Sequence, residues 1–109
     1  MKSKEYNISF YKKAGSLNEI FYIAESSAPE NGDIANHLTL SDKYLTEDQI
    51  EELNKVLNGI RVQEDWGEVM GSQLEIFPQE NTVQVGYTNR RIPLSDFKQL
   101  LEEWLLFIS

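Results

Sequence analysis

The sequence contains no cysteine and only one histidine, His37, and this scarcity removes several kinds of chemistry. Without cysteine the chain forms no disulfide and offers no thiol nucleophile, which is typical of a reducing compartment. Zinc sites of the zinc-finger type are excluded for the same reason. A Ser–His–Asp arrangement would have to use His37, which lies in the least patterned stretch, residues 25–45. We therefore interpret His37 as a surface or capping residue and expect no catalytic site.

Long apolar runs and phosphate-binding motifs are missing too. No stretch approaches the roughly 18 apolar residues of a membrane span, and the N-terminus lacks the apolar core of a secretory signal. The 6 glycines are isolated, with no Gly-Lys-Ser/Thr run. Basic residues pair only at Lys12-Lys13 and Arg90-Arg91, which favours solubility devices at a turn or edge strand over phosphate contacts. We expect a soluble, cytoplasmic protein with no metal or cofactor that binds neither nucleic acid nor membrane.

Negative charge is what the sequence has in excess, and it is unevenly placed. The chain of 109 residues has 18 acidic and 10 basic side chains, for a formal charge of −8. Residues 46–80 hold nine acids and two bases, which makes −7 of that total. A field this lopsided steers a basic partner and repels nucleic acid. The length and the 40% hydrophobic content fit one globular domain, residues 1–109.

Alternating apolar residues predict two antiparallel hairpins. The first joins Tyr6–Lys12 to Leu17–Ala24, and the second joins Gln73–Phe77 to Thr82–Tyr87. A short strand over Arg90–Pro93 follows the second hairpin. The second strand of the first hairpin is continuously apolar from residue 20 to residue 24, which indicates a strand covered on both faces or in the centre of a sheet.

Two amphipathic helices are predicted. Thr46 and Gln49 fit a capping box at the start of the first, and Asn58-Gly59 fits its end. Its apolar stripe consists of Ile50, Leu53, Leu57 and Ile60. Ser95 is the expected N-cap of the second helix, whose stripe consists of Phe97, Leu100, Leu101, Trp104, Leu105 and Ile108. Residues 34–40 fit either a short helix or a poor strand. The pattern predicts a single α+β domain, an antiparallel sheet of about four to five strands with two main helices packed on it.

The candidate site is a protein-binding surface in the acidic third of the chain. Trp66 sits among carboxylates, which is the makeup of an interface anchor surrounded by charge. The alternative is an ordinary solvated helix face followed by a polar loop. A raised pKa of Asp65 beside Trp66 would be needed for acid–base work, and we favour a solvated Asp65. The predicted partner-binding residues are Glu47, Asp48, Glu51, Glu52, Glu64, Asp65, Trp66 and Glu68.

The stretch from Val83 to Trp104 has a strand, a tight turn, the sequence Ile92-Pro93-Leu94 and an amphipathic helix that ends in a Trp-containing apolar turn. It resembles the C-terminal part of small acidic immunity proteins that accompany bacterial polymorphic and contact-dependent growth-inhibition toxins. The resemblance implies a stoichiometric inhibitor that binds a toxin domain, often a basic nuclease, and blocks its active site or an adjacent surface. It assigns no inhibitory residue, so the acidic residues above come from the charge argument alone.

Two other function classes stay open at this point. One is a structural or adaptor domain that self-associates through an exposed strand edge or the Trp104–Phe107 end, so the free protein is either a monomer or a dimer. The other is an enzyme that uses two carboxylates in a deep pocket. Without a motif for the second, we expect a cationic protein partner and no enzymatic activity.

Overall fold

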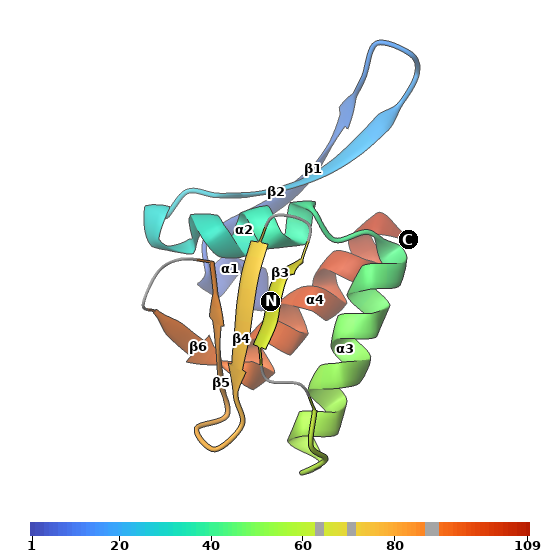
Figure 1. Cartoon of the computed structure of the whole chain (residues 1–109). Coiled ribbons are helices and arrows are strands. Elements are labelled where there is room, and N and C mark those ends of the chain that lie inside the picture. Colours follow the sequence, from blue (N-terminus) through green and yellow to red (C-terminus); the bar gives the residue numbers. More distant parts are fainter. Residues whose placement is uncertain (63–64, 70–71, 87–89) are drawn as a thin grey trace.

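Two separate antiparallel sheets and three longer helices make up the fold (Figure 1). The computed structural model describes residues 1–62, 65–69, 72–86 and 90–109, and for 65–69 and Ser72 it describes the backbone alone. The elements are α1 (Lys2–Glu5), β1 (Ile8–Ala14), β2 (Ile20–Ser26), the 3-10 helix η1 (Pro29–Asn31), α2 (Gly32–Thr39), α3 (Lys43–Leu57), β3 (Asp65–Val69), β4 (Ser72–Phe77), β5 (Thr82–Val85), β6 (Arg91–Pro93) and α4 (Leu94–Ile108).

The larger sheet has the strand order β3-β4-β5-β6, and every neighbouring pair is antiparallel. The predicted second hairpin is confirmed over β4 and β5, with Ile76 opposite Val83, and Tyr87, the last residue of its predicted second strand, lies outside the described residues. The short third strand is confirmed as β6, with Ile92 opposite Val83 on the other side. Gly86 directly follows β5, and its φ of +82° favours glycine. A Cβ on Gly86 would also lie 2.4 Å from the Asp33 carboxylate, so α2 approaches the sheet closely here.

The predicted first hairpin is confirmed too, but it forms a sheet of its own. β1 and β2 pair from Ile8↔Ser26 to Ala14↔Ile20, and α2 lies between this hairpin and the larger sheet (Figure 1). The expectation of one sheet was therefore wrong, although the α+β class is correct. The physical reason lies at Thr39 of α2, whose hydroxyl bonds both the backbone N–H (2.9 Å) and the C=O (3.0 Å) of Ala24. A side chain takes the place of a neighbouring strand at this point.

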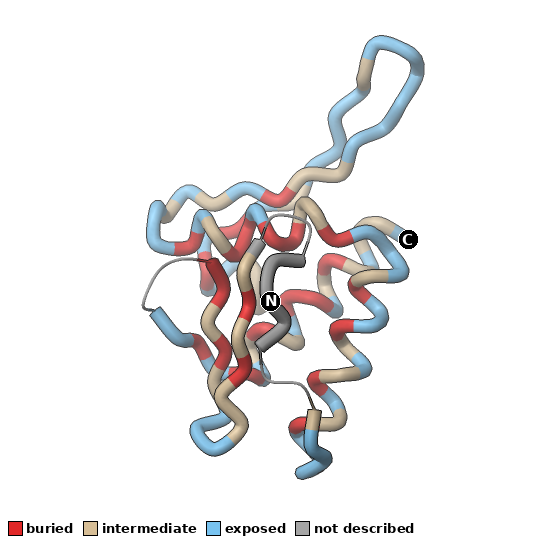
Figure 2. Tube along the Cα trace, in the orientation of Figure 1, coloured by how far each residue is buried: buried red, intermediate tan, exposed pale blue. Residues whose placement is uncertain are grey.

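The distal half of the hairpin projects from the body of the protein (Figure 2). The protein measures 45 × 27 × 26 Å along its principal axes. Near the base, the Phe10 ring packs edge-on against Trp104, with 5.2 Å between ring centroids. Farther out, Ile20 is 59% exposed and Phe21 is 49% exposed. The prediction that β2 is covered on both faces was therefore wrong beyond its base.

The core lies between the larger sheet and the helices α2, α3 and α4. α4 confirms the predicted stripe in its first three turns, and Leu105 and Ile108 are half-buried. Among the described residues, the hydrophobic ones exposed by 1% or less are Leu38, Leu53, Leu74, Ile76, Val83, Leu94, Phe97, Leu100, Leu101 and Trp104. α4 begins at Leu94, two residues earlier than a cap at Ser95 predicts, because Pro93 is the N-cap and the Leu94 N–H donates to the Asn81 carbonyl at 2.8 Å.

α3 begins four residues earlier than the capping box indicates. Asp42 is its N-cap and accepts a hydrogen bond from the Leu45 N–H at 2.8 Å. Thr46 consequently lies inside the helix, where its hydroxyl donates to the Asp42 carbonyl at 2.6 Å. The buried face consists of Thr46, Gln49, Leu53 and Val56, while Leu57 and Ile60 of the predicted stripe are exposed. The polar side chains of Thr46 and Gln49 are therefore buried at positions that the apolar pattern predicted to be exposed.

Candidate functional site

The outer face of α3 carries carboxylates as predicted. Glu47, Asp48 and Glu51 are exposed, and they have no ion-pair partner among the residues that the structure describes. Glu52 differs from them, because it is half-buried and pairs with Lys55 at 2.9 Å. The helix therefore presents three carboxylates that form no ion pair with the described residues, and a fourth, Glu52, that pairs with Lys55.

Tyr44 joins these carboxylates, and sequence reasoning missed it. It is 76% exposed and lies in the first turn of α3, three residues before Glu47 and four before Asp48. Side chains three and four apart are neighbours on a helix, so the tyrosine and the carboxylates share one face. The signal that could have found it is Asp42, a strong N-cap residue that allows the helix to start before Tyr44. We call Tyr44, Glu47, Asp48 and Glu51 the α3 acidic face.

The structure tests only part of the remaining predicted site. Glu64 lies outside the described residues, and for Asp65, Trp66 and Glu68 only the backbone is described. That backbone forms β3, at the edge of the larger sheet. Its register shifts between Asp65 and Gly67, which is the signature of a β-bulge at Trp66. Whether these side chains join the α3 acidic face stays a prediction.

His37 is neither a loop residue nor exposed. It lies in α2, is 1% exposed, and its Nε2 is 2.5 Å from Gln49 Oε1 of α3. Gln49 also donates to Ser41 Oγ at 3.1 Å, and the Trp104 indole donates to the Ser41 carbonyl at 2.9 Å. Burial lowers the pKa of His37, and the contact with Gln49 opposes this to a smaller extent. The prediction of a surface or capping residue was wrong; His37 belongs to a buried polar network that joins α2, α3 and α4.

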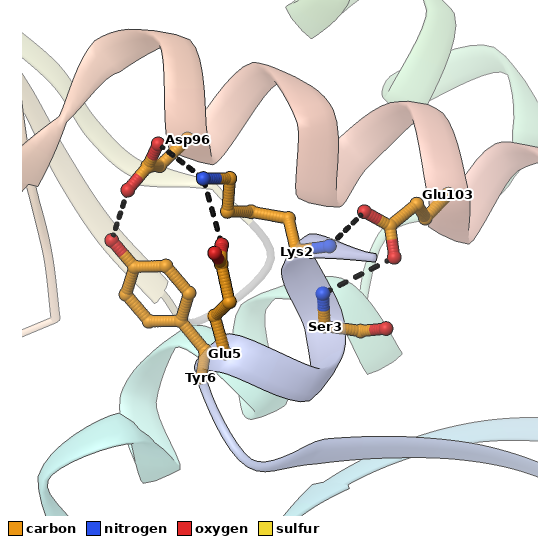
Figure 3. Close-up of polar contacts among 6 residues, drawn as sticks. All are labelled: Lys2, Ser3, Glu5, Tyr6, Asp96 and Glu103. Atoms are coloured by element: carbon orange, nitrogen blue, oxygen red, sulfur yellow. Dashed lines mark hydrogen bonds and ion pairs between the residues drawn. The ribbon is translucent and has the colours of Figure 1, made fainter.

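A second polar cluster ties α1 to α4 (Figure 3). Glu103 accepts the backbone N–H groups of Lys2 (2.9 Å) and Ser3 (3.2 Å). Asp96 accepts the Tyr6 hydroxyl at 2.7 Å and lies 3.1 Å from the Lys2 ammonium group. Burial, followed by the bond to Asp96, raises the pKa of Tyr6, which keeps its phenol neutral and makes it a poor base or nucleophile. The cluster fixes the N-terminal segment on α4.

The described residues hold neither a metal centre nor a membrane-spanning helix. Among them, no group of three or more His, Asp or Glu side chains lies close enough to hold a metal ion. Over the same ranges, no helix has the length and apolar content that crossing a bilayer requires. A groove of about 410 Å³ at the base of the hairpin includes Tyr22, Trp104 and Ile108 in its lining, and its one carboxylate, Asp42, caps α3. This groove lacks the pair of acids that acid–base chemistry would use.

The two basic doublets differ in their surroundings: the arginines contact other residues of the chain, and the lysines lie in an edge strand. Arg91 pairs with Glu80 at 2.7 Å and lies over the Phe77 ring. Arg90 bonds the Asn31 side chain and the Glu30 carbonyl. Lys12 and Lys13 lie in β1, an edge strand, as the solubility interpretation predicted.

Comparison with known families, curated proteins and solved structures finds no match to this chain.

Proposed function

We propose that this protein is an immunity-type binding protein that neutralises a cationic toxin domain, such as a nuclease, and catalyses no reaction. The observation that carries the proposal is the α3 acidic face. Glu47, Asp48 and Glu51 are exposed there and form no ion pair with the described residues, and the exposed ring of Tyr44 lies beside them. The resemblance of residues 83–104 to immunity proteins adds the toxin as the class of partner.

The geometry of α3 suits recognition of lysine and arginine side chains. Because three of its carboxylates have no ion pair among the described residues, a cationic partner would not have to break one. Each carboxylate offers two acceptor oxygens, which match the paired donors of a guanidinium group. Tyr44 supplies a large amphipathic contact of the kind that dominates binding energy at interfaces.

The distribution of charge supports the same face. Residues 46–80, which include most of α3, carry −7 of the −8 formal charge. A concentrated field of one sign raises the association rate of an oppositely charged partner about 10- to 1,000-fold. For an inhibitor that must capture its toxin before the toxin acts, rapid association is the property that matters.

The experiment uses the C-terminal domain of a secreted protein encoded beside this gene. We expect that expression of that domain alone arrests growth and that co-expression of this protein restores it. The purified pair is then mixed by stopped flow. The double substitution Glu47→Lys and Glu51→Lys should slow association by about tenfold or more, because it reverses the field at the binding face.

A control variant with the same change in net charge distinguishes an effect of the overall electrostatic field from an effect of the α3 acidic face itself. Glu25→Lys with Glu30→Lys alters the net charge by the same amount at exposed positions away from α3. Tyr44→Ala should weaken affinity about 30-fold, which corresponds to about 2 kcal/mol for a hot-spot side chain. Equal rates for the two double variants, together with unchanged affinity for Tyr44→Ala, would exclude this face as the interface.

A further inference from the structure

One edge of the projecting hairpin is an unpaired β-strand. Among the strands that the structure describes, β2 is hydrogen-bonded to β1 alone. Gly15 N–H bonds the Glu19 carbonyl at 2.7 Å, so the backbone of Glu19 faces β1. Ala24 bonds Thr39 instead, so its backbone faces away from β1. Because backbone groups alternate along a strand, Ile20 and Tyr22 face outward with Ala24.

Thr39 limits this free edge to the projecting part of β2. It occupies both backbone groups of Ala24, so another strand can pair with residues 20–23 only. Those four residues are Ile20, Phe21, Tyr22 and Ile23, with no charge among them. An exposed apolar edge is the kind that pairs with another strand, and a two-stranded hairpin by itself is only marginally stable in water.

We propose that β2 pairs antiparallel with β2 of a second copy of this chain, about a two-fold axis that passes through Phe21. Ile20 of each copy then lies opposite Tyr22 of the other in a hydrogen-bonded pair, and the two Phe21 residues face each other. Each hydrogen-bonded pair exchanges two N–H···O bonds, so the axis generates about four. The product is a four-stranded sheet in which the two β1 strands are the outer edges.

The distribution of charge favours a second copy of this chain as the partner, and it favours β2 over β1 as the strand that pairs. Residues 8–26 hold Lys12, Lys13, Glu19 and Glu25, for a net charge of zero, so the two copies meet where each is neutral. Pairing through β1 would bring lysines of the two copies together, and like charges across strands are destabilising.

A cysteine at the axis tests the register. The chain has no cysteine of its own, so a single introduced thiol is unambiguous. Directly opposed residues in a non-hydrogen-bonded pair have Cα atoms about 4.5 Å apart, within the range of a disulfide. Phe21→Cys should therefore form a covalent dimer under mild oxidation about tenfold faster, or more, than Leu17→Cys, since its thiols are held together. Leu17 is the matched control, because it is 78% exposed at the tip but off the edge. Equal rates for the two variants would overturn the proposal.

Proline substitution tests the edge without a thiol. Ile20 and Ala14 lie opposite each other in the hairpin, and both backbones face outward, on opposite edges. Proline is tolerated where a strand N–H faces solvent. By sedimentation equilibrium, we expect wild type and Ala14→Pro to dimerise with rising concentration and Ile20→Pro to remain monomeric. A monomeric wild type, or an Ile20→Pro dimer, would contradict the proposal.

This dimer is independent of toxin binding. The Glu47→Lys and Glu51→Lys variant, which should bind toxin slowly, should dimerise like wild type. If toxin binding protected the hairpin while the free protein stayed monomeric at every concentration, the edge would belong to the toxin and the second copy would be excluded.

Discussion

Thr46, Gln49, Ser41 and His37 are buried polar side chains that a hydrophobic pattern would leave at the surface. Each finds partners in the network that joins α2, α3 and α4, and the Trp104 indole completes it. A satisfied polar group inside a protein costs little, whereas one left without a partner costs about 1–3 kcal/mol. The network therefore constrains how the three helices pack and makes the fold sensitive to the protonation of its one histidine.

Acidification should destabilise the protein through His37. Burial lowers the pKa of His37 in the folded state, while the unfolded chain keeps the ordinary value near 6.5. Below about pH 6.5 the unfolded chain binds the additional proton, so the free energy of unfolding falls as the pH falls, with a slope of up to about 1.4 kcal/mol per pH unit. Above that pH this contribution is fully present. Urea titrations between about pH 7.5 and 5.5 measure the slope.

His37→Gln is the control for this effect, because a glutamine retains hydrogen-bonding capacity but does not titrate. Its stability should change less over the same pH range. A variant with the same slope as wild type would assign the acid sensitivity to the carboxylates instead.

At the scale of elements, the boundaries of α3 decide which side chains are buried and which can bind. Starting at Lys43 and not after Thr46, the helix gains Tyr44 for its exposed face and moves Thr46 into the core. Both Asp42 and Thr46 are good N-cap residues, and the capping box favoured Thr46. Thr46 and Gln49 are buried partners in the polar network between the helices, and this network favours Asp42 over Thr46 as the N-cap.

Asp42→Ala should destabilise the protein by about 1 kcal/mol, since the Leu45 N–H loses its capping acceptor. Chemical denaturation measures this change. Asp48→Ala is the comparison, because Asp48 is exposed on the same helix without a capping bond. If the two substitutions cost the same, Asp42 does not cap α3.

The sequence was sufficient for elements whose pattern is local. The two hairpins and the α4 stripe follow from alternation and from helical spacing, and all three are confirmed. The burial of His37 and the separation of the two sheets could not be predicted, because both depend on contacts between different elements. His37 contacts Gln49 of α3 and the Phe97 ring of α4, and Thr39 of α2 occupies the backbone of β2 at Ala24. The residues next to His37 and Ala24 in the sequence do not indicate which distant side chains these two residues contact.

At the scale of the whole molecule, the charge and the unpaired strand lie on different parts. The hairpin is neutral, while residues 46–80 carry most of the negative charge. The two proposed interactions should therefore respond to salt in opposite ways. Contacts between exposed charges weaken as the screening length shortens, whereas apolar strand pairing between two acidic copies does not.

Raising salt from about 0.1 M to 1 M shortens the screening length from about 10 Å to about 3 Å. Toxin association should slow steeply over this range, and the self-association constant should stay level or rise. Stopped-flow mixing and sedimentation equilibrium measure the two quantities. Toxin association that is insensitive to salt would contradict recognition by the α3 acidic face.

The position of α4 in the chain also governs when the protein can fold. Its buried side chains, Phe97, Leu100, Leu101 and Trp104, fill the centre of the core, and every element that they contact comes earlier in the sequence. During synthesis the preceding segments leave the ribosome first. They lack the α4 side chains that fill the centre of the core until α4 has left the ribosome too. A chain interrupted before residue 94 would expose its apolar strands to proteases and chaperones. Only molecules translated through this helix would reach the folded state that binding requires.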